Sequence, residues 1–275
     1  MKNLKGKINE IIENHSLLII IVFGFIVSTA LTVYTGIRAD DKLWNFVNTY
    51  KMYNGGTIYI NNNVIITPLF FYIGLGLFKV LGANYFTFNI YNIVIWFSFD
   101  ILVYNLFSTL LTNKKRVVLS TILIILSACL LIPSGANYNF LAVDFVLLGM
   151  ILNKRIEGKK LNTILQGIIS FVVFFSKQNI GAMYIFSLLI LNIYKWQKNK
   201  DKSYIFVFIK EMLIAGILLF ISLGAMYLSG NLEGFLNYAI FGLGEFAQYN
   251  TSRKKSRSNR RNSNCNICSG FSSYY

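Results

Sequence analysis

Residues 17–37 read LLIIIVFGFIVSTALTVYTGI, a run of apolar and hydroxyl-bearing residues without a charged side chain. A helix needs roughly 20 such residues to cross about 30 Å of hydrocarbon. The run is too long for the apolar part of a typical signal peptide, lacks a clear small-x-small cleavage site, and is followed by further apolar runs. It therefore predicts a first membrane span that the mature protein keeps.

The rest of the chain repeats this pattern. Only 13% of the residues are charged and 55% are hydrophobic, whereas a soluble domain carries about a quarter charged residues. The sequence predicts an all-α integral membrane protein, a polytopic helical bundle with about 7–8 membrane segments over residues 1–250. After 17–37, the apolar segments cover 64–82, 86–111, 117–133, 140–152, 161–176, 180–194 and 204–228.

The formal net charge of +15 follows membrane topology and does not indicate a nucleic-acid partner. Lysines and arginines gather in short loops, the pattern of cytoplasmic loops under the positive-inside rule. A multi-pass protein of the plasma membrane with a cytoplasmic N-terminus is expected. The basic stretches are Lys2 to Lys7, Lys114 to Arg116, Lys154 to Lys160 and Lys195 to Lys202; the loops 38–63, 133–139, 177–179 and 229–250 are poor in positive charge and would lie outside.

Two consecutive segments conflict with this topology. If 64–82 and 86–111 both crossed, Lys114 to Arg116 would lie outside. The segment 64–82 contains Pro68 and three glycines, so it is the better candidate for a re-entrant or interfacial segment. We therefore expect 86–111 to cross and 64–82 not to.

The first outer loop, 38–63, predicts a short amphipathic helix on the outer surface. Asp40 and Asp41 stand at its start, where a carboxylate accepts backbone N–H bonds. Leu43, Val47 and Tyr50 share one helical face with Trp44 beside them, and Gly55-Gly56 ends the run. Tyrosine and tryptophan suit the membrane–water interface.

The tail, residues 251–275, differs from everything before it. It is rich in arginine, serine and asparagine and has no apolar period, so either disorder or a frameshift would account for it. Cys265 and Cys268 form a lone CxxC there, a weak metal or redox signal without a second pair.

Ionisable groups gather on the expected outer face: Asp40, Asp41, Asp144, Lys177, Glu233 and Glu245. Carboxylates with a lysine among them could accept a proton and hold a phosphate. Plainer roles are helix capping for Asp40 and Asp41 and snorkelling for Lys177. Asp144 lies in an apolar run where a deep charge costs roughly 3 kcal/mol, which argues against an accidental acid and leaves a functional and a structural role equally open.

Asp100 lies near the middle of 86–111 and has no chemical role that the sequence reveals. It is either protonated or paired with Lys79, should 64–82 fold back against 86–111.

The order of several short motifs resembles the GT-C class of membrane glycosyltransferases, which use polyprenyl-phosphate sugars. The similar branch includes protein mannosyltransferases and lipid A aminoarabinose transferases. The resemblance covers roughly residues 1–250 and rests on order and spacing. The matching features are the acidic pair after the first span, Tyr53-Asn54-Gly55-Gly56 with Tyr59, Thr67-Pro68-Leu69 and Gly82, Asn137-Tyr138 through Asp144, and Gly167 through Phe175-Ser176-Lys177-Gln178.

The resemblance implies a role for each matching residue. Asp40 or Asp41 would be the catalytic base that deprotonates an acceptor hydroxyl, and Lys177 would neutralise the polyprenyl phosphate. Asp144 would orient the acceptor or a divalent metal; no other cofactor is implied. Two features depart from the family: no arginine follows Gly82 between Asn84 and Asn92, and family members are longer. The chain thus looks like an amino-terminal part, which would be inactive alone.

Two other functions remain open. A transporter or lipid flippase would also place ionisable residues in a helical bundle, with its charges along a midplane path. A membrane assembly subunit without chemistry is the third reading. The sugar, the acceptor and the oligomeric state are not readable from the sequence.

Overall fold

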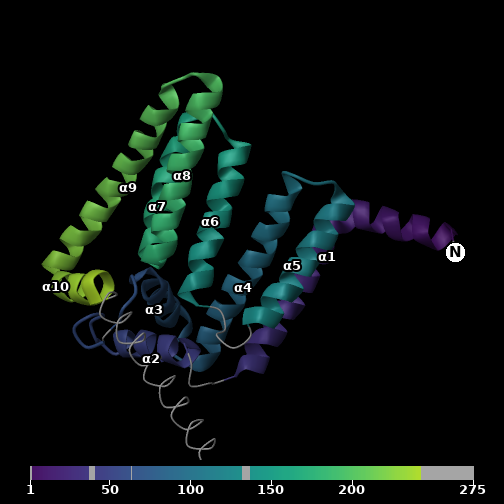
Figure 1. Cartoon of the computed structure of the whole chain (residues 1–275). Helices are drawn as coiled ribbons and strands as arrows, with labels where there is room; N and C mark the ends of the chain where they lie inside the picture. The colour runs from purple at the N-terminus through teal and green to yellow at the C-terminus, as the bar shows by residue number, and fades with distance from the viewer. Residues whose placement is uncertain (1, 37–40, 63, 132–136, 243–275) are drawn as a thin grey trace, which may run out of the picture.

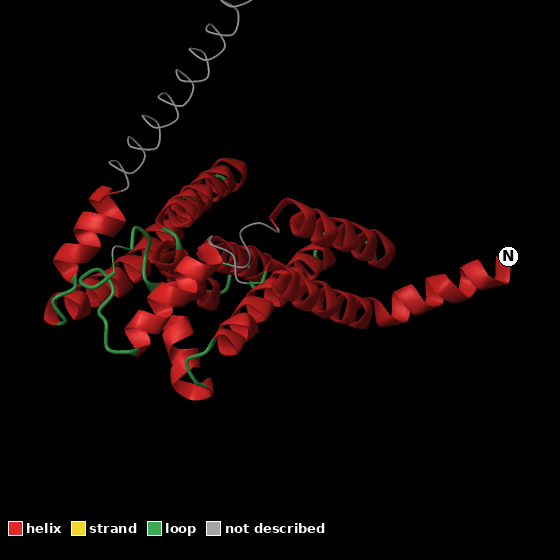
Figure 2. Cartoon of the chain, turned by 90° about the horizontal axis from the view of Figure 1, so that it is seen from below, coloured by secondary structure: helices red, strands yellow, loops and turns green. Residues whose placement is uncertain are grey.

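The computed structural model describes residues 2–36, 41–62, 64–131 and 137–242. Within these ranges the chain is helical with short loops, and the one β-bridge joins Ile58 and Asn62 (Figure 2). The elements are α1 (Lys2–Thr35), α2 (Asp41–Tyr53), α3 (Leu69–Leu81), α4 (Tyr85–Ser108), α5 (Asn113–Leu131), α6 (Tyr138–Arg155), α7 (Lys160–Ser176), α8 (Gln178–Asn199), α9 (Ser203–Leu228), α10 (Leu232–Gly234) and the π-helix η2 (Phe235–Phe241).

Every predicted apolar segment coincides with a helix, which confirms the all-helical fold class. Among the described residues, three helices are long and apolar enough to cross a membrane: His15–Tyr34, Tyr85–Ser108 and Ser203–Leu228. The first begins where α1 bends, because His15 has a non-helical backbone with φ −121° and ψ 20°. The chain therefore has the helices of a membrane protein. Asp40, Glu245 and the tail 251–275 lie outside the described residues.

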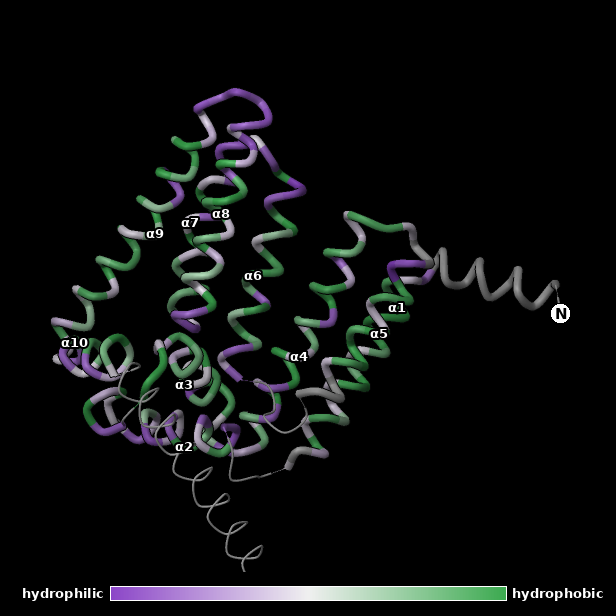
Figure 3. Tube along the Cα trace, in the orientation of Figure 1, coloured by the Kyte–Doolittle hydropathy of each residue, from purple (hydrophilic) through white to green (hydrophobic). Residues whose placement is uncertain are grey.

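The helices from α4 to α9 run alternately up and down one bundle (Figure 1). The connections α4–α5, α6–α7 and α8–α9 lie together at one end, at the top of Figure 1, and the most hydrophilic of them joins α8 to α9 (Figure 3). These connections carry the three basic loops, at Lys114, at Lys154 to Lys160 and at Lys195 to Lys202. We call this the basic end; α2 and α3 lie at the opposite end.

Helix α3 explains how the basic loops come to share one end. It has only 13 residues, about 20 Å of helix at 1.5 Å per residue, against about 30 Å of hydrocarbon. It stays beside α2 in Figure 1, and α4 then runs the length of the bundle. This arrangement agrees with the prediction that 64–82, and not 86–111, is the segment that fails to traverse.

Helix α2 confirms the predicted helix at Asp41 and turns its polar side toward the protein. Lys42, Asn45 and Thr49 are buried, whereas Val47 and Tyr50 are exposed. A helix on a water-soluble protein would do the reverse, because its apolar stripe would face the core. The exposed apolar side of α2 therefore suits a membrane interface, as the sequence predicted.

Aromatic side chains hold α2, α3 and the start of α4 together. The Phe46 ring of α2 meets Phe78 of α3 and Phe88 of α4 edge-on, with ring centroids 6.0 and 5.6 Å apart. The Tyr91 hydroxyl of α4 donates a hydrogen bond to the carbonyl oxygen of Phe70, at 3.0 Å. Edge-to-face pairs each add about 0.5–1.5 kcal/mol beyond burial, so this cluster holds α2 in place against α3 and α4.

Candidate functional site on the alpha2 end of the bundle

Three segments meet at the α2 end of the bundle and bring Asp41, Tyr138 and Lys177 together. Asp41 is the first residue of α2. Tyr138 is the first residue of α6, which Asn137 caps: its side chain accepts a hydrogen bond from the backbone N–H of Asn139 at 2.9 Å. Lys177 is the single residue between α7 and α8. We call these three side chains the outer triad, after the face on which the sequence predicts them.

The extended backbone of Lys177, with φ −157° and ψ 112°, breaks one helix and begins the next. Such a sharp junction requires α7 and α8 to approach closely. Gly181 permits this, because a Cβ atom there would lie 2.3 Å from the Cα atom of Phe174. The close packing of α7 on α8 thus sets the position from which Lys177 extends.

Tyr138 is the centre of the outer triad. Its hydroxyl donates to Oδ2 of Asp41 at 3.5 Å, which is long for a hydrogen bond. The ammonium nitrogen of Lys177 lies over the Tyr138 ring, 4.5 Å from the centroid. The Asp41 carboxylate also interacts electrostatically with Lys177. One aromatic ring therefore contacts both an acid and a base.

These contacts change how the groups titrate. Burial lowers the pKa of Lys177, and the charge of Asp41 acts in the opposite direction. For Tyr138, burial together with the charge of Asp41 and the hydrogen bond to it raise the pKa from 10.0 to about 12. Tyr138 therefore keeps its proton at neutral pH and remains a donor toward Asp41.

Asp144, the other predicted site residue, lies inside the bundle on α6. Ser98 of α4 donates a hydrogen bond to its Oδ2 at 2.6 Å, and its Oδ1 has no hydrogen-bond partner among the described residues. No contact between Asp144 and the outer triad is found in the described ranges. The structure brings Asp41 and Lys177 together but directs Asp144 toward α4.

Asp100 is the acid that Asp144 approaches, since the two carboxylates interact electrostatically. Ser28 of α1 donates to Oδ2 of Asp100 at 3.2 Å. Of the two alternatives for Asp100, pairing with Lys79 is not found, because Lys79 is exposed near the end of α3. The packing of α1 on α4 turns Asp100 away from α3: a Cβ atom at Gly24 would lie 2.9 Å from its carboxylate.

The polar side of α2 carries two buried side chains, Lys42 and Asn45, that follow Asp41 closely in the sequence. Lys42 is 2% exposed, and its ammonium donates to the carbonyl oxygen of Thr32 at 3.0 Å. Neither the oxygen nor the nitrogen of the Asn45 side chain has a hydrogen-bond partner in the described part of the chain. Unsatisfied buried amides cost about 1–3 kcal/mol, so this layer is suited to receive water or a polar ligand.

Metal binding finds no support in the described ranges, where no three His, Cys, Asp or Glu side chains gather. Glu233 is exposed on α10. Cys265 and Cys268 lie outside the described residues. The outer triad therefore offers proton transfer and anion binding through its own side chains.

Comparison of the chain with protein-family models, with curated proteins and with solved structures finds no match. The function is therefore inferred from the outer triad and from the motifs in the sequence.

Proposed function

We propose that the chain is a GT-C-like membrane glycosyltransferase that moves a sugar from a polyprenyl-phosphate donor to an acceptor on the outer face of the membrane. The supporting observation is that Tyr138 contacts both Asp41, one of the two acids that the family resemblance offers as the base, and Lys177, its phosphate contact. Asp41 meets the Tyr138 hydroxyl, and Lys177 lies over the ring. Both residues were identified from separate motifs 136 positions apart in the sequence (177 − 41).

The chemistry needs an acid–base group and a cation near one another. Asp41 accepts the proton of the acceptor hydroxyl, and the hydroxyl oxygen forms a bond to the anomeric carbon of the sugar. The bond from that carbon to the phosphate oxygen breaks, and the polyprenyl phosphate leaves from the opposite side, so the configuration inverts. The negative charge that grows on the phosphate is met by Lys177.

Tyr138 serves this chemistry as a positioning residue. Its ring holds the flexible lysine stem through a cation–π contact, worth about 0.5–2 kcal/mol. Its hydroxyl lies 3.5 Å from Oδ2 of Asp41. Because this contact is long, an acceptor hydroxyl can displace the Tyr138 hydroxyl from Asp41. The acceptor hydroxyl would then lie less than about 3.2 Å from the carboxylate oxygen.

The proposal includes the finer topology. About 7–8 segments lie in the membrane, α3 is the one that does not cross, and the basic end faces the cytoplasm under the positive-inside rule. The α1 N-terminus is then cytoplasmic, and the outer triad faces outward. A polyprenyl-phosphate donor would approach from the lipid beside the exposed apolar side of α2.

Binding of a fluorescent polyprenyl-phosphate sugar to the purified chain tests this function, because binding needs only the outer triad and its surroundings. We expect saturable binding that Lys177→Met weakens at least about tenfold, the loss of one charge-assisted contact. Parental affinity in Lys177→Met, or no binding by the parental chain, would refute the proposal.

The buried pair Asp100 and Asp144 favours a second candidate, a transporter or flippase. Both acids lie within the bundle, hydrogen-bonded to Ser28 and Ser98, and acids inside a membrane bundle commonly line ion or substrate paths. Flipping of a lipid-linked sugar in vesicles would stop in both Asp100→Asn and Asp144→Asn if this function holds. Binding at the outer triad would be unchanged by either substitution.

A further inference from the structure

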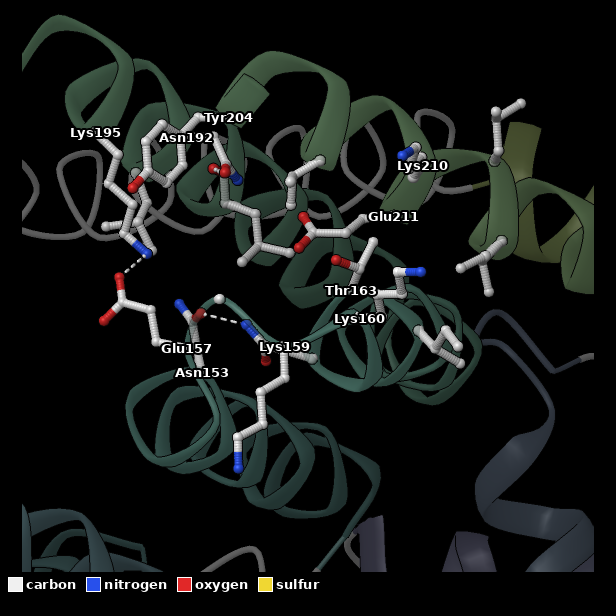
Figure 4. A pocket seen from close by; sticks show the side chains of 18 residues that line it. Asn153, Glu157, Lys159, Lys160, Thr163, Asn192, Lys195, Tyr204, Lys210 and Glu211 are labelled. Carbon is white, nitrogen blue, oxygen red and sulfur yellow. Dashed lines mark hydrogen bonds and ion pairs between the residues drawn. The ribbon is translucent and has the colours of Figure 1, made fainter. Parts of the chain in front are cut away.

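A cavity of about 550 Å³ lies at the basic end, between α7, α8, α9 and the end of α6. Figure 4 shows lysines around it: Lys159, Lys160, Lys195 and Lys210. Its walls include apolar side chains such as Leu188 and Ile214. An apolar pocket with a few charged groups is the usual form of a small-molecule or lipid site. It is far from the outer triad, at the other end of the same helices.

The charges of the cavity leave a positive excess. Lys195 forms an ion pair with Glu157 at 2.7 Å, so these two charges offset each other. The remaining charged lining residues are Lys159, Lys160 and Lys210, which are exposed, and Glu211. Three cations against one acid give a net charge of +2 and favour an anionic group at the mouth.

Glu211 is the one acid among the lining residues that has no ion-pair partner in the described part of the chain. It is 3% exposed, and its Oε2 has no hydrogen-bond partner among the residues that the structure describes. In Figure 4 its carboxylate points into the cavity beside Thr163. A buried carboxylate oxygen without a donor is costly, so a ligand that fills the cavity should bring an N–H or O–H group to it.

Hydrogen bonds join the lining residues Asn153 and Asn162 to Gln166 and Tyr184, which do not line the cavity. Asn162 donates to Asn153 at 2.9 Å, Gln166 donates to Asn162 at 3.2 Å, and the Tyr184 hydroxyl donates to Gln166 at 2.5 Å. These side chains are thus engaged with one another. The side chains around the cavity are thus already ordered, and Oε2 of Glu211 still needs a hydrogen-bond donor.

Gly167 sets the position of Glu211 in the wall of the cavity. A Cβ atom at Gly167 would lie 2.8 Å from the backbone oxygen of Glu211 and 2.7 Å from Cβ of Ile214. Only glycine lets α9 approach α7 so closely. The close approach turns the Glu211 side chain toward the space between α7, α8 and α9.

We propose that this cavity binds a phospholipid whose headgroup carries a hydrogen-bond donor. The phosphate lies at the exposed lysines, the headgroup N–H or O–H donates to Glu211, and the acyl chain follows the apolar wall of Leu188 and Ile214. Basic pockets between membrane helices bind lipid headgroups in this way. Phosphatidylethanolamine and phosphatidylglycerol meet these requirements, whereas phosphatidylcholine has no headgroup donor.

Native mass spectrometry of the full chain from mixed micelles tests the proposal, with equal amounts of phosphatidylethanolamine, phosphatidylglycerol and phosphatidylcholine. We expect retention of either donor lipid at least about tenfold above phosphatidylcholine. Glu211→Gln, which keeps the size of the side chain, and Lys159→Gln/Lys160→Gln should each lower that retention at least about fivefold. Lys200→Gln/Lys202→Gln is the matched control, because it removes two exposed lysines of the same end that do not line the cavity.

Each arm can overturn the proposal. Equal retention of the three lipids would show general charge attraction and no specific binding site. A loss of retention in the control variant as large as in the cavity variants would show the same. Parental retention in both cavity variants would place the lipid elsewhere. If soluble glycerophosphoethanolamine competed at the same concentration as the lipid, the ligand of the cavity would be a free phosphate ester and not a phospholipid. The melting temperature of each variant, expected within a few degrees of the parent, excludes unfolding as the cause.

Discussion

The ammonium nitrogen of Lys177 lies 4.5 Å from the centre of the Tyr138 ring, and this contact joins the α7–α8 junction to the start of α6. The same tyrosine reaches Asp41 at the beginning of α2 through its hydroxyl. Because a lysine stem has about 2 kcal/mol of rotamer entropy to lose, a ring that holds it in advance lowers the cost of binding an anion. Four predictions follow from this arrangement and from the topology around it.

Asp41→Asn should abolish most sugar transfer while leaving the fold intact. Asparagine has nearly the same size and is about as good a helix N-cap as aspartate, but it cannot accept the proton. We expect the rate of transfer from a polyprenyl-phosphate sugar to fall by about 10²-fold or more. The rate is measured in membranes that contain a full-length form, because the family resemblance implies that the chain alone would be inactive.

Asp40→Asn is the control variant for this experiment, because it changes the acid next to Asp41 in the sequence. Asp41 is the acid that contacts Tyr138, so we expect a smaller loss in Asp40→Asn. If both variants transferred sugar at the parental rate, the acids would be helix-capping residues and the base assignment would fail.

Lys177→Met should raise the dissociation constant for the lipid-linked sugar at least about tenfold and change the melting temperature little. Methionine keeps an apolar stem against the Tyr138 ring and deletes the charge that meets the phosphate. Lys79→Met is the control, since Lys79 is exposed at the same end of the bundle. An equal effect in Lys79→Met would reveal general electrostatic attraction.

Tyr138 should titrate near pH 12 in the folded chain and at lower pH when Asp41 is neutralised. Burial is the largest cause of its raised pKa, and the charge of Asp41 and the hydrogen bond to it add to that effect. Asp41→Asn should therefore move the pKa from about 12 part of the way back toward 10.0. Ultraviolet difference titration, with Tyr138→Phe subtracted, isolates this tyrosine from the others.

The sign of the linked stability follows from the same shift. A folded pKa above the unfolded value means that the folded state binds the proton more tightly. The contribution to stability is present in full below pH 10 and is lost as the pH rises through about 12. A Tyr138 pKa that did not respond to Asp41→Asn would show that the 3.5 Å contact does not form in solution.

The topology predicts opposite labelling of the two ends in intact cells. A cysteine at Asn54 should react with an impermeant reagent from outside, and one at Lys154 only after permeabilisation. Both side chains are exposed. Asn62 in the same predicted outer loop as Asn54, and Asn137 in the next outer loop, are each 2% exposed and unsuitable. The natural cysteines Cys129, Cys265 and Cys268 are first replaced by serine. Outside labelling of Lys154→Cys would invert the orientation and place the outer triad in the cytoplasm.

Local chemistry explains why so much of the fold could be predicted. The helix at Asp41 to Tyr53 was predicted from acids at its start and glycines after its end, and Val47 and Tyr50 do face away from the protein. Such signals are contained in a few consecutive residues. The pairing of Asp100 with Lys79 failed, because it depended on how α1, α3 and α4 pack.

The candidate site shows the same division. Asp41 and Lys177 were proposed from their motifs. Tyr138, the residue that contacts both, stood in the Asn137-Tyr138 motif but was assigned no role of its own. The Asp144 assignment rested on its position after that loop, and the structure turns its side chain to Ser98. Which way a helical residue faces depends on the rotation of the whole helix against its neighbours.

The sequence by itself determined that this chain forms apolar helices, roughly where each lies along the chain, and which loops are basic, because transfer free energy is a property of each segment alone. Only the tertiary structure decided that Tyr138 lies between residues 41 and 177, and that Glu211 faces a cavity. Those relationships arise where helices distant in sequence pack, as at Gly167 and Gly181, and they depend on side-chain volumes from both partners at once.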